Sequence, residues 1–140
     1  MNKYLLDTNI CIFYMKGLYS LDQKIEQVGQ SNCYISDITV AELLYGAYHS
    51  KNQKHINETR QFINEFTIIP LSDFADSFAS EKNRLTDIGQ LIDDFDIMIG
   101  ISALKCGCIV VTDNIKHFSR IKDLKVENWI DRSFAITTNK

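Results

Sequence analysis

The chain has 140 residues, of which 45% are hydrophobic, so we expect residues 1–140 to form a single compact domain with a real core. Its formal net charge is −3, which argues against a protein that coats nucleic acid through a broad basic surface. The opening MNKYLLD lacks the apolar stretch of a secretory signal, and no apolar run is long enough to cross a bilayer, so we expect a cytoplasmic protein.

The first half of the chain predicts short strands that are followed by helices. Apolar runs mark the strands, and apolar residues at helical spacing mark the helices. In chain order, the pattern predicts a strand at 4–6, a helix over 10–17, a strand at 33–35, a helix running to 48, a helix over 54–66 and a strand at 67–69. Pro70 closes the last of these strands.

The second half continues the alternation. Ser72 or Asp73 is expected to cap a helix that ends by Gly89, and a strongly apolar helix begins near Asp93 and stops at Gly107. Strands are predicted at 108–111 and 126–129. This order predicts a three-layer α/β/α fold with a mainly parallel sheet of about five strands. In such sheets the ligand binds beyond the carboxyl ends of the strands.

The four cysteines are expected to be structural. Cys11, Cys33, Cys106 and Cys108 lie in apolar stretches, and the only close pair is spaced C-x-C. Buried, reduced thiols are therefore expected for all four.

Acidic residues gather where the predicted strands end. They are Asp7 after the first strand, Asp37 and Glu42 after the second, Asp113 after the fourth, and Asp93, Asp94 and Asp96 at the start of the helix before the fourth. Like charges held close together repel, so folding alone gains nothing from this convergence. A hard divalent cation such as Mg²⁺ or Mn²⁺ removes the conflict. The chemistry that this cluster indicates is metal-assisted hydrolysis of a phosphodiester bond.

Some of these acids also have a purely structural explanation in the helices that they precede. Asp7 suits the cap of the following helix, and Glu42 completes the capping-box pattern that begins at Thr39. The acids at 93, 94 and 96 lie in a first helical turn, where negative charge is favoured, so at least one is expected to be only a cap. Asp113 fits an Asx-type turn. Their joint placement at strand ends favours the functional interpretation.

Four segments in the right order resemble a known family. They are YLLDTNICIF at 4–13, ITVAELLYG at 38–46, FDIMIG at 95–100, and the stretch from VTDN at 111–114 through Phe118 to Trp129. Together they resemble PIN-domain ribonucleases and, within these, the VapC toxins of bacterial toxin–antitoxin pairs. The resemblance covers nearly the whole chain.

The resemblance implies roles for particular residues. Asp7 and Asp96 would ligate the principal metal, and Glu42 would help to position metal or water; this choice selects Asp96 over its two acidic neighbours. The family's fourth polar ligand usually stands two residues after the threonine, which is Asn114 here, whereas the nearby acid is Asp113, so both stay candidates. Thr8, Asn9 and Thr112 are the expected supporting partners.

The resemblance further implies a homodimer, an antitoxin that inserts a segment near the acidic pocket, and RNA as the substrate. The members that this chain resembles most act on initiator tRNA near the anticodon. The hypothesis is therefore a Mg²⁺- or Mn²⁺-dependent endoribonuclease toxin. Two alternatives are a non-catalytic PIN-fold binding module and a receiver-like Mg²⁺-binding domain. The receiver-like domain would need an aspartate at the end of the third strand, where the sequence has Ile69 and Pro70.

Overall fold

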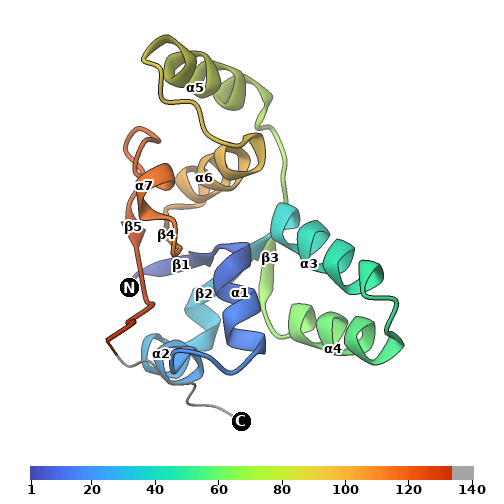
Figure 1. The fold of residues 1–140 in the computed structure, drawn as a ribbon. Coiled ribbons are helices and arrows are strands. Elements are labelled where there is room, and N and C mark those ends of the chain that lie inside the picture. The colour runs from blue at the N-terminus through green and yellow to red at the C-terminus, as the bar shows by residue number, and fades with distance from the viewer. Residues whose placement is uncertain (134–140) are drawn as a thin grey trace.

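A computed structural model describes residues 1–133 and contains a sheet of five parallel strands in the order β3-β2-β1-β4-β5 (Figure 1). The strands are β1 (Lys3–Leu6), β2 (Cys33–Ser36), β3 (Thr67–Ile69), β4 (Cys108–Val111) and β5 (Val126–Glu127). The predicted parallel α/β architecture is confirmed. The last strand is shorter than predicted and ends at Glu127.

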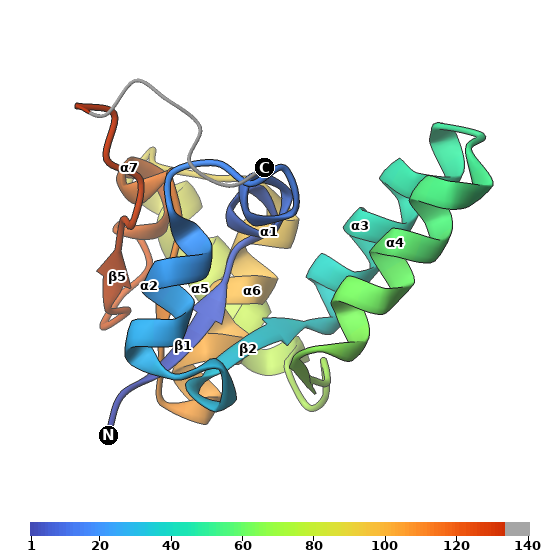
Figure 2. The same ribbon diagram turned by 90° about the horizontal axis from the view of Figure 1, so that it is seen from below.

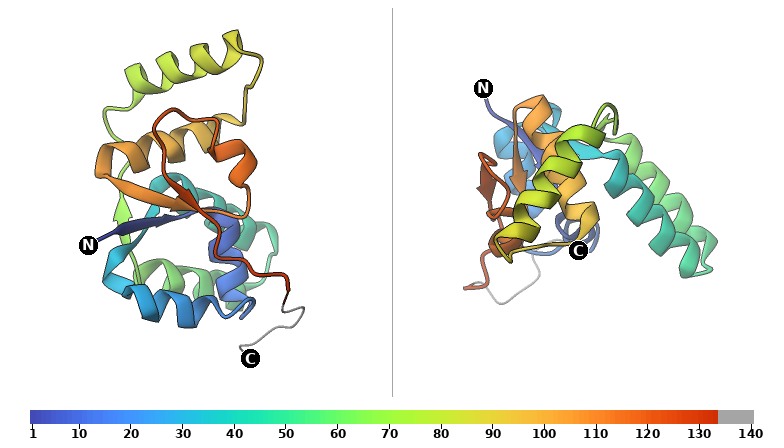
Figure 3. Two further views of the ribbon diagram at one scale, coloured as in Figure 1. Left: turned by 90° about the vertical axis from the view of Figure 1, so that its left-hand side faces the viewer. Right: turned by 90° about the horizontal axis from the view of Figure 1, so that it is seen from above.

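Helices cover both faces of the sheet. They are α1 (Thr8–Met15), α2 (Leu21–Val28), α3 (Asp37–His49), α4 (Gln53–Asn64), α5 (Ala75–Asp87), α6 (Asp94–Cys106) and α7 (Ile115–Phe118), with a 3-10 turn η1 (Gln30–Asn32) before β2. In Figure 1, α1 and α2 lie on one side of the sheet and α6 and α7 on the other. A side view shows α5 outside α6, farther from the strands (Figure 3).

Two hydrophobic clusters occupy the two faces of the sheet. Leu5 and Val110 belong to the cluster beneath α6, whereas Leu6 and Val111 belong to the cluster beneath α1. All four are fully buried, because successive side chains of a strand point to opposite faces and helices cover both. This explains why β1 after Lys3 and the whole of β4 are continuous apolar runs without a polar alternation.

The register of the central strands places their carboxyl ends at one edge. Leu6 pairs with Val111, and the amide of Asp7 donates to the carbonyl of Val111 at 2.9 Å. Ser36, the last residue of β2, pairs with Ile69. The segments that leave β1, β2 and β4 therefore begin side by side, as the topology predicts.

The helices α3 and α4 form a hairpin that projects from the sheet (Figure 2). The helix α3 begins directly after β2, so its first turn is at the sheet edge while its last turn lies far from it. The hairpin leaves a groove against α1, which is described below.

One local expectation was wrong, and two short helices were not predicted. The cap predicted at Ser72 or Asp73 is absent: α5 begins after Phe74, no side chain caps it, and Asp73 has a φ of 48°. The sequence pattern did not predict α2, because its polar LDQKIEQV leaves only Leu21 and Ile25 to be buried. It also missed the single turn of α7, which is too short to show periodicity.

The cysteines only partly follow the prediction. Cys11, Cys33 and Cys108 are buried and unpaired, and burial raises the pKa of Cys33 and Cys108 to about 11, so these thiols are inert at neutral pH. Cys106 is free but exposed, so the expectation of burial was wrong for it. It lies in the last turn of α6, next to Gly107, whose φ of 69° ends the helix at the surface.

Within residues 1–133, no helix is both long enough and apolar enough to cross a membrane.

Candidate active site

Asp7 connects the ends of β1 and β4. Its Oδ1 accepts a 2.8 Å hydrogen bond from the amide of Thr8, and its Oδ2 accepts one of 2.8 Å from the hydroxyl of Thr112. The oxygen of Thr112 accepts in turn from the amide of Asn114 at 2.9 Å. Asp7 is thus the N-cap of α1, as one alternative predicted, but capping uses only one of its two oxygens. Burial, the largest cause, raises its pKa above the ordinary value.

Glu42 is not part of a capping box. The N-cap of α3 is Ser36, whose Oγ accepts from the amide of Thr39 at 3.1 Å, so the helix begins before the residue that the capping-box pattern requires. The Oε1 of Glu42 instead accepts a 2.6 Å hydrogen bond from the hydroxyl of Thr8. Glu42 therefore reaches from α3 to the segment that leaves β1.

The three acids at the start of α6 have different surroundings. Asp93 is the N-cap and accepts from the amide of Phe95 at 2.8 Å. Asp94 forms a 3.0 Å ion pair with Lys82 of α5. Asp96 is partly buried, and no residue between 1 and 133 donates a hydrogen bond to its carboxylate. The expectation that one of the three acts as a cap is confirmed for Asp93.

Asp96 carries the clearest electrostatic signal. Burial, together with the negative charges of Asp7, Asp93 and Glu42, raises the pKa of Asp96 to about 7. The negative charge of Glu42 also contributes, after burial, to the raised pKa of Asp7. These carboxyl groups come from the end of β1, from α3 and from the start of α6, so the fold brings together acids that are far apart in the sequence.

Asp113, the acid that follows β4, pairs with a residue outside this cluster. Its carboxylate binds Arg132 through two hydrogen bonds of 2.5 and 2.8 Å and accepts a third, of 3.3 Å, from Asn128. Arg132 is the main reason that the pKa of Asp113 is lowered. The side-chain amide nitrogen of Asn114 lies 2.8 Å from Nδ1 of His117.

The remaining predicted residues have peripheral positions. Asp37 accepts a 3.0 Å hydrogen bond from the amide of Leu71, so it ties the start of α3 to the segment after β3. Asn9 is exposed in the first turn of α1.

The donor set suits a hard divalent cation. Carboxylates are the ligands that Mg²⁺ and Mn²⁺ prefer, and a positive ion would relieve the repulsion that raises the pKa of Asp96. Among the residues described, no three His, Cys, Asp or Glu side chains already form a ready metal-binding group. Mg²⁺ is commonly held by only one or two carboxylates and keeps several waters.

Comparison with known proteins decides the family. The sequence profile of the PIN domain matches residues 4–124. The chain belongs to the PIN-domain family. It is 36% identical over 133 residues to Ribonuclease VapC2 of Haemophilus influenzae, with 93% of this chain and all of that protein covered. It is 30% identical over 131 residues to the tRNA(fMet)-specific endonuclease VapC of Shigella flexneri, with 92% and 99% covered.

Solved VapBC structures contain chains with the same fold. The structure of VapBC2 from Rickettsia felis bound to a promoter DNA fragment contains a chain that matches with a TM-score of 0.82 at 32% identity, covering 90% of this chain and 98% of that one. The DNA-bound VapBC of Salmonella typhimurium matches equally well, with a TM-score of 0.82 at 30% identity and 92% and 99% covered.

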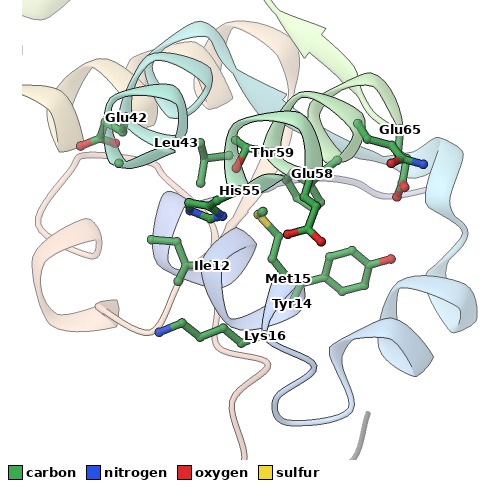
Figure 4. A pocket seen from close by; sticks show the side chains of 13 residues that line it. Ile12, Tyr14, Met15, Lys16, Glu42, Leu43, His55, Glu58, Thr59 and Glu65 are labelled. Carbon is green, nitrogen blue, oxygen red and sulfur yellow. The ribbon is translucent and has the colours of Figure 1, made fainter. Parts of the chain in front are cut away.

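A groove of about 670 Å³ adjoins the acids in this PIN domain (Figure 4). It lies between α1 and the α3–α4 hairpin, and Glu42 is at one end of it. Its apolar lining includes Ile12, Met15, Leu43 and Phe62, and its charged residues are Lys16, Glu42, Glu58 and Glu65. Thr59 also lines it; this residue is 1% exposed, and its Oγ1 is the one buried side-chain polar atom within residues 1–133 that has no hydrogen-bond partner.

Sequence reasoning missed three residues that hold the acids in place. Ser36 and Thr39 connect to Glu42 through Thr8, but the S-x-x-T-x-x-E spacing that contains them was interpreted only as a capping box beginning at Thr39. Arg132 lies 19 positions after Asp113, and no short motif links the two.

Proposed function

We propose that this PIN domain is a metal-dependent endoribonuclease and the toxin of a toxin–antitoxin pair. The observation that carries the proposal is the partly buried carboxyl group of Asp96, whose pKa is raised to about 7 by burial and by the neighbouring acids. Carboxyl groups that repel one another do not stabilise the fold. At the carboxyl edge of a parallel sheet, where ligands bind, such a cluster is typical of a catalytic site. The relatives named as ribonucleases support the same conclusion.

Asp7 and Asp96 are the proposed principal ligands of a Mg²⁺ or Mn²⁺ ion, and Glu42 is the residue that helps to position the ion or the attacking water. When bound, the ion lowers the pKa of water and neutralises charge on the phosphate. Hydrogen bonds from Thr8 and Thr112 fix both oxygens of Asp7, and the hydroxyl of Thr8 fixes one oxygen of Glu42. Because each carboxylate oxygen has two lone pairs, both acids retain lone pairs for an ion or for water.

The fourth contact is proposed for Asn114 in preference to Asp113. The charge of Asp113 is already neutralised by Arg132, so it has little left to offer a cation. The amide nitrogen of Asn114 faces His117, which leaves the amide oxygen available. Asp113 then holds the chain after β4 in place through Arg132, and its catalytic effect is indirect.

Initiator tRNA is the proposed substrate, and the cytoplasm, where that RNA functions, is the proposed location. The support is the name of the Shigella relative, a tRNA(fMet)-specific endonuclease, at 30% identity. The Haemophilus relative at 36% identity is named only as a ribonuclease, so RNA in general is the broader proposal.

A protein antitoxin is the proposed partner. The matched structures from Rickettsia and Salmonella are VapBC assemblies. In this chain, the groove beside Glu42 supports the proposal, because its apolar floor and its three glutamates suit a segment with apolar and basic side chains. We also propose a homodimer, supported by the exposed apolar residues Ile88, Leu91 and Phe95, which are 48 to 52% exposed around the turn between α5 and α6.

Removal of the metal tests the activity. Purified protein with Mg²⁺ should cut total bacterial RNA at discrete positions, and the mapped ends should fall near the anticodon of initiator tRNA. EDTA should abolish the cuts, and an excess of Mg²⁺ or Mn²⁺ should restore them. Cleavage that persists in EDTA would exclude the metal mechanism, and cuts confined to other RNAs would exclude the proposed substrate.

Filling the groove tests the antitoxin. A Cβ at Gly46 of α3 would meet no atom within 4 Å, so Gly46→Leu should extend into the groove without straining the helix. We expect the affinity for the proposed antitoxin to fall about tenfold or more, measured by calorimetry. Gly46→Ala is the matched control and should bind like the parent. Equal binding by the leucine variant would place the partner elsewhere.

A further inference from the structure

Glu42 is the last acceptor in a chain of hydrogen bonds that begins in the buried interior. We propose that Thr39 is a positioning residue for catalysis: with Ser36, it fixes through Thr8 the direction in which Glu42 presents its carboxylate. This inference rests on the proposed function only for the role of Glu42. The series of hydrogen bonds itself follows from the geometry of the side chains.

The contacts run in sequence from the junction of β2 and α3 to the first residue of α1 and back to α3. The amide of Thr39 is 3.1 Å from Oγ of Ser36, which lies 3.4 Å from Oγ1 of Thr39. That hydroxyl is 3.0 Å from Oγ1 of Thr8, which is 2.6 Å from Oε1 of Glu42. Thr39 is fully buried and Ser36 is 1% exposed, so water does not compete for these groups.

The direction of every bond is fixed because a hydroxyl has a single proton. Thr8 donates its proton to the carboxylate of Glu42, so in the contact between the two threonines Thr8 must accept and Thr39 must donate. Thr39 has then used its own proton and must accept from Ser36. Ser36 accepts from the amide of Thr39, which closes the series. No alternative arrangement of protons satisfies all four contacts.

This directionality gives Thr39 a role beyond the start of a helix. The helix is already capped by Ser36, so the hydroxyl of Thr39 is not needed to satisfy a backbone group. Its proton makes Thr8 a donor oriented towards Glu42, and aligned hydrogen bonds polarise one another. Glu42 lies on the projecting hairpin. The series of hydrogen bonds holds its carboxylate against Thr8, which follows the end of β1.

The test compares two buried threonines. Thr39→Val removes the hydroxyl at nearly constant shape, Thr39→Ser keeps it, and Thr59→Val removes a buried hydroxyl that has no partner. The measurements are kcat and KM for RNA cleavage and, without RNA, the affinity for Mn²⁺ by calorimetry. Thr39→Val should lower kcat or weaken Mn²⁺ binding by about 10- to 100-fold with little change in KM. Thr39→Ser and Thr59→Val should resemble the parent.

A double-mutant cycle separates positioning from general damage. If Thr39 acts through Glu42, Thr39→Val should have no further effect on Mn²⁺ affinity or kcat in a Glu42→Gln background. An equal effect in that background overturns the proposal, as does a Thr39→Val protein that matches the parent in both kcat and Mn²⁺ affinity.

Two further controls keep the test decisive. If circular dichroism shows that Thr39→Val does not fold, Ser36→Gly replaces it, because glycine is nearly as good an N-cap and removes only the preceding hydroxyl. That variant should show a smaller loss of the same kind, and no loss overturns the proposal. If the parent binds Mn²⁺ and Thr39→Val weakens that binding, but the parent cleaves no RNA, the proposed function is refuted and the positioning role of Thr39 stands.

Discussion

Asp96→Asn should reduce RNA cleavage by at least about 100-fold in kcat, because it removes a proposed metal ligand and not merely a hydrogen bond. The matched control is Asp94→Asn, two residues earlier in the same helical turn. Asp94 pairs with Lys82 on the outer helix α5, so its loss should change kcat by less than about twofold, as is typical of an exposed ion pair. Cleavage of initiator tRNA with saturating Mg²⁺ measures both.

The comparison isolates position from charge, since both substitutions remove one negative charge from the first turn of α6. Equal activity in the parent and the Asp96 variant would make Asp96 an ordinary residue of a helix start and would remove the basis of the proposed site. Equal loss in both variants would show that the helix start as a whole, and not the carboxyl group of Asp96, supports activity.

The fold was predictable from sequence where a segment is buried on both sides. The central strands β1, β2 and β4 are short apolar runs because helices cover both faces of the sheet, and α6 is apolar because it packs between the sheet and α5. The helix α2 was not predictable in this way, since only Leu21 and Ile25 of its eight residues are buried. The absence of a side-chain cap at α5 was not predictable for a different reason: the backbone at Asp73 has a positive φ, which no sequence pattern indicated.

The site was predictable to the extent that topology alone determines it. Parallel strands end at one edge, so the placement of Asp7 and Glu42 near each other follows from the strand order. Side-chain partners do not follow from it. The pairing of Asp113 with Arg132 depends on the path of the chain after β5, and the link from Thr39 to Glu42 depends on which residue caps α3. These contacts decide which acids remain available to a ligand.

In the absence of metal, the protein should be less stable at pH 8 than at pH 5, and Asp96 is the main reason. An aspartate in the unfolded chain has a pKa near 3.9, whereas the pKa of Asp96 in the folded chain is about 7. Between these values the folded state binds more protons, so the free energy of unfolding falls as the pH rises and levels off above pH 7. The raised pKa of Asp7 acts in the same direction.

Carboxyl groups with lowered pKa values do not contribute to the change in stability between pH 5 and pH 8. The pKa values of Glu81 and Asp113 lie below the ordinary range, mainly because of Arg84 and Arg132 respectively. Their contribution to stability is lost only as the pH falls towards those low values, and it is therefore constant from pH 5 to pH 8. Comparing the parent with a variant at Asp96 isolates the contribution of Asp96 from those of the other groups.

The measurement is thermal unfolding in EDTA from pH 5 to pH 8. Asparagine imitates the protonated carboxyl, so the melting temperature of Asp96→Asn should exceed that of the parent by an amount that grows with pH, and the excess should be about 3 to 6 °C larger at pH 8 than at pH 5. Asp94→Asn should show no such rise. Mg²⁺ should stabilise the parent at pH 8 much more than at pH 5, because it competes with the proton, and should have little effect on the Asp96 variant. Parallel melting curves for parent and variant at every pH would contradict the raised pKa. A variant that is more stable and yet inactive would show that Asp96 costs the fold free energy, which is expected of an acid that serves catalysis and not of a helix cap.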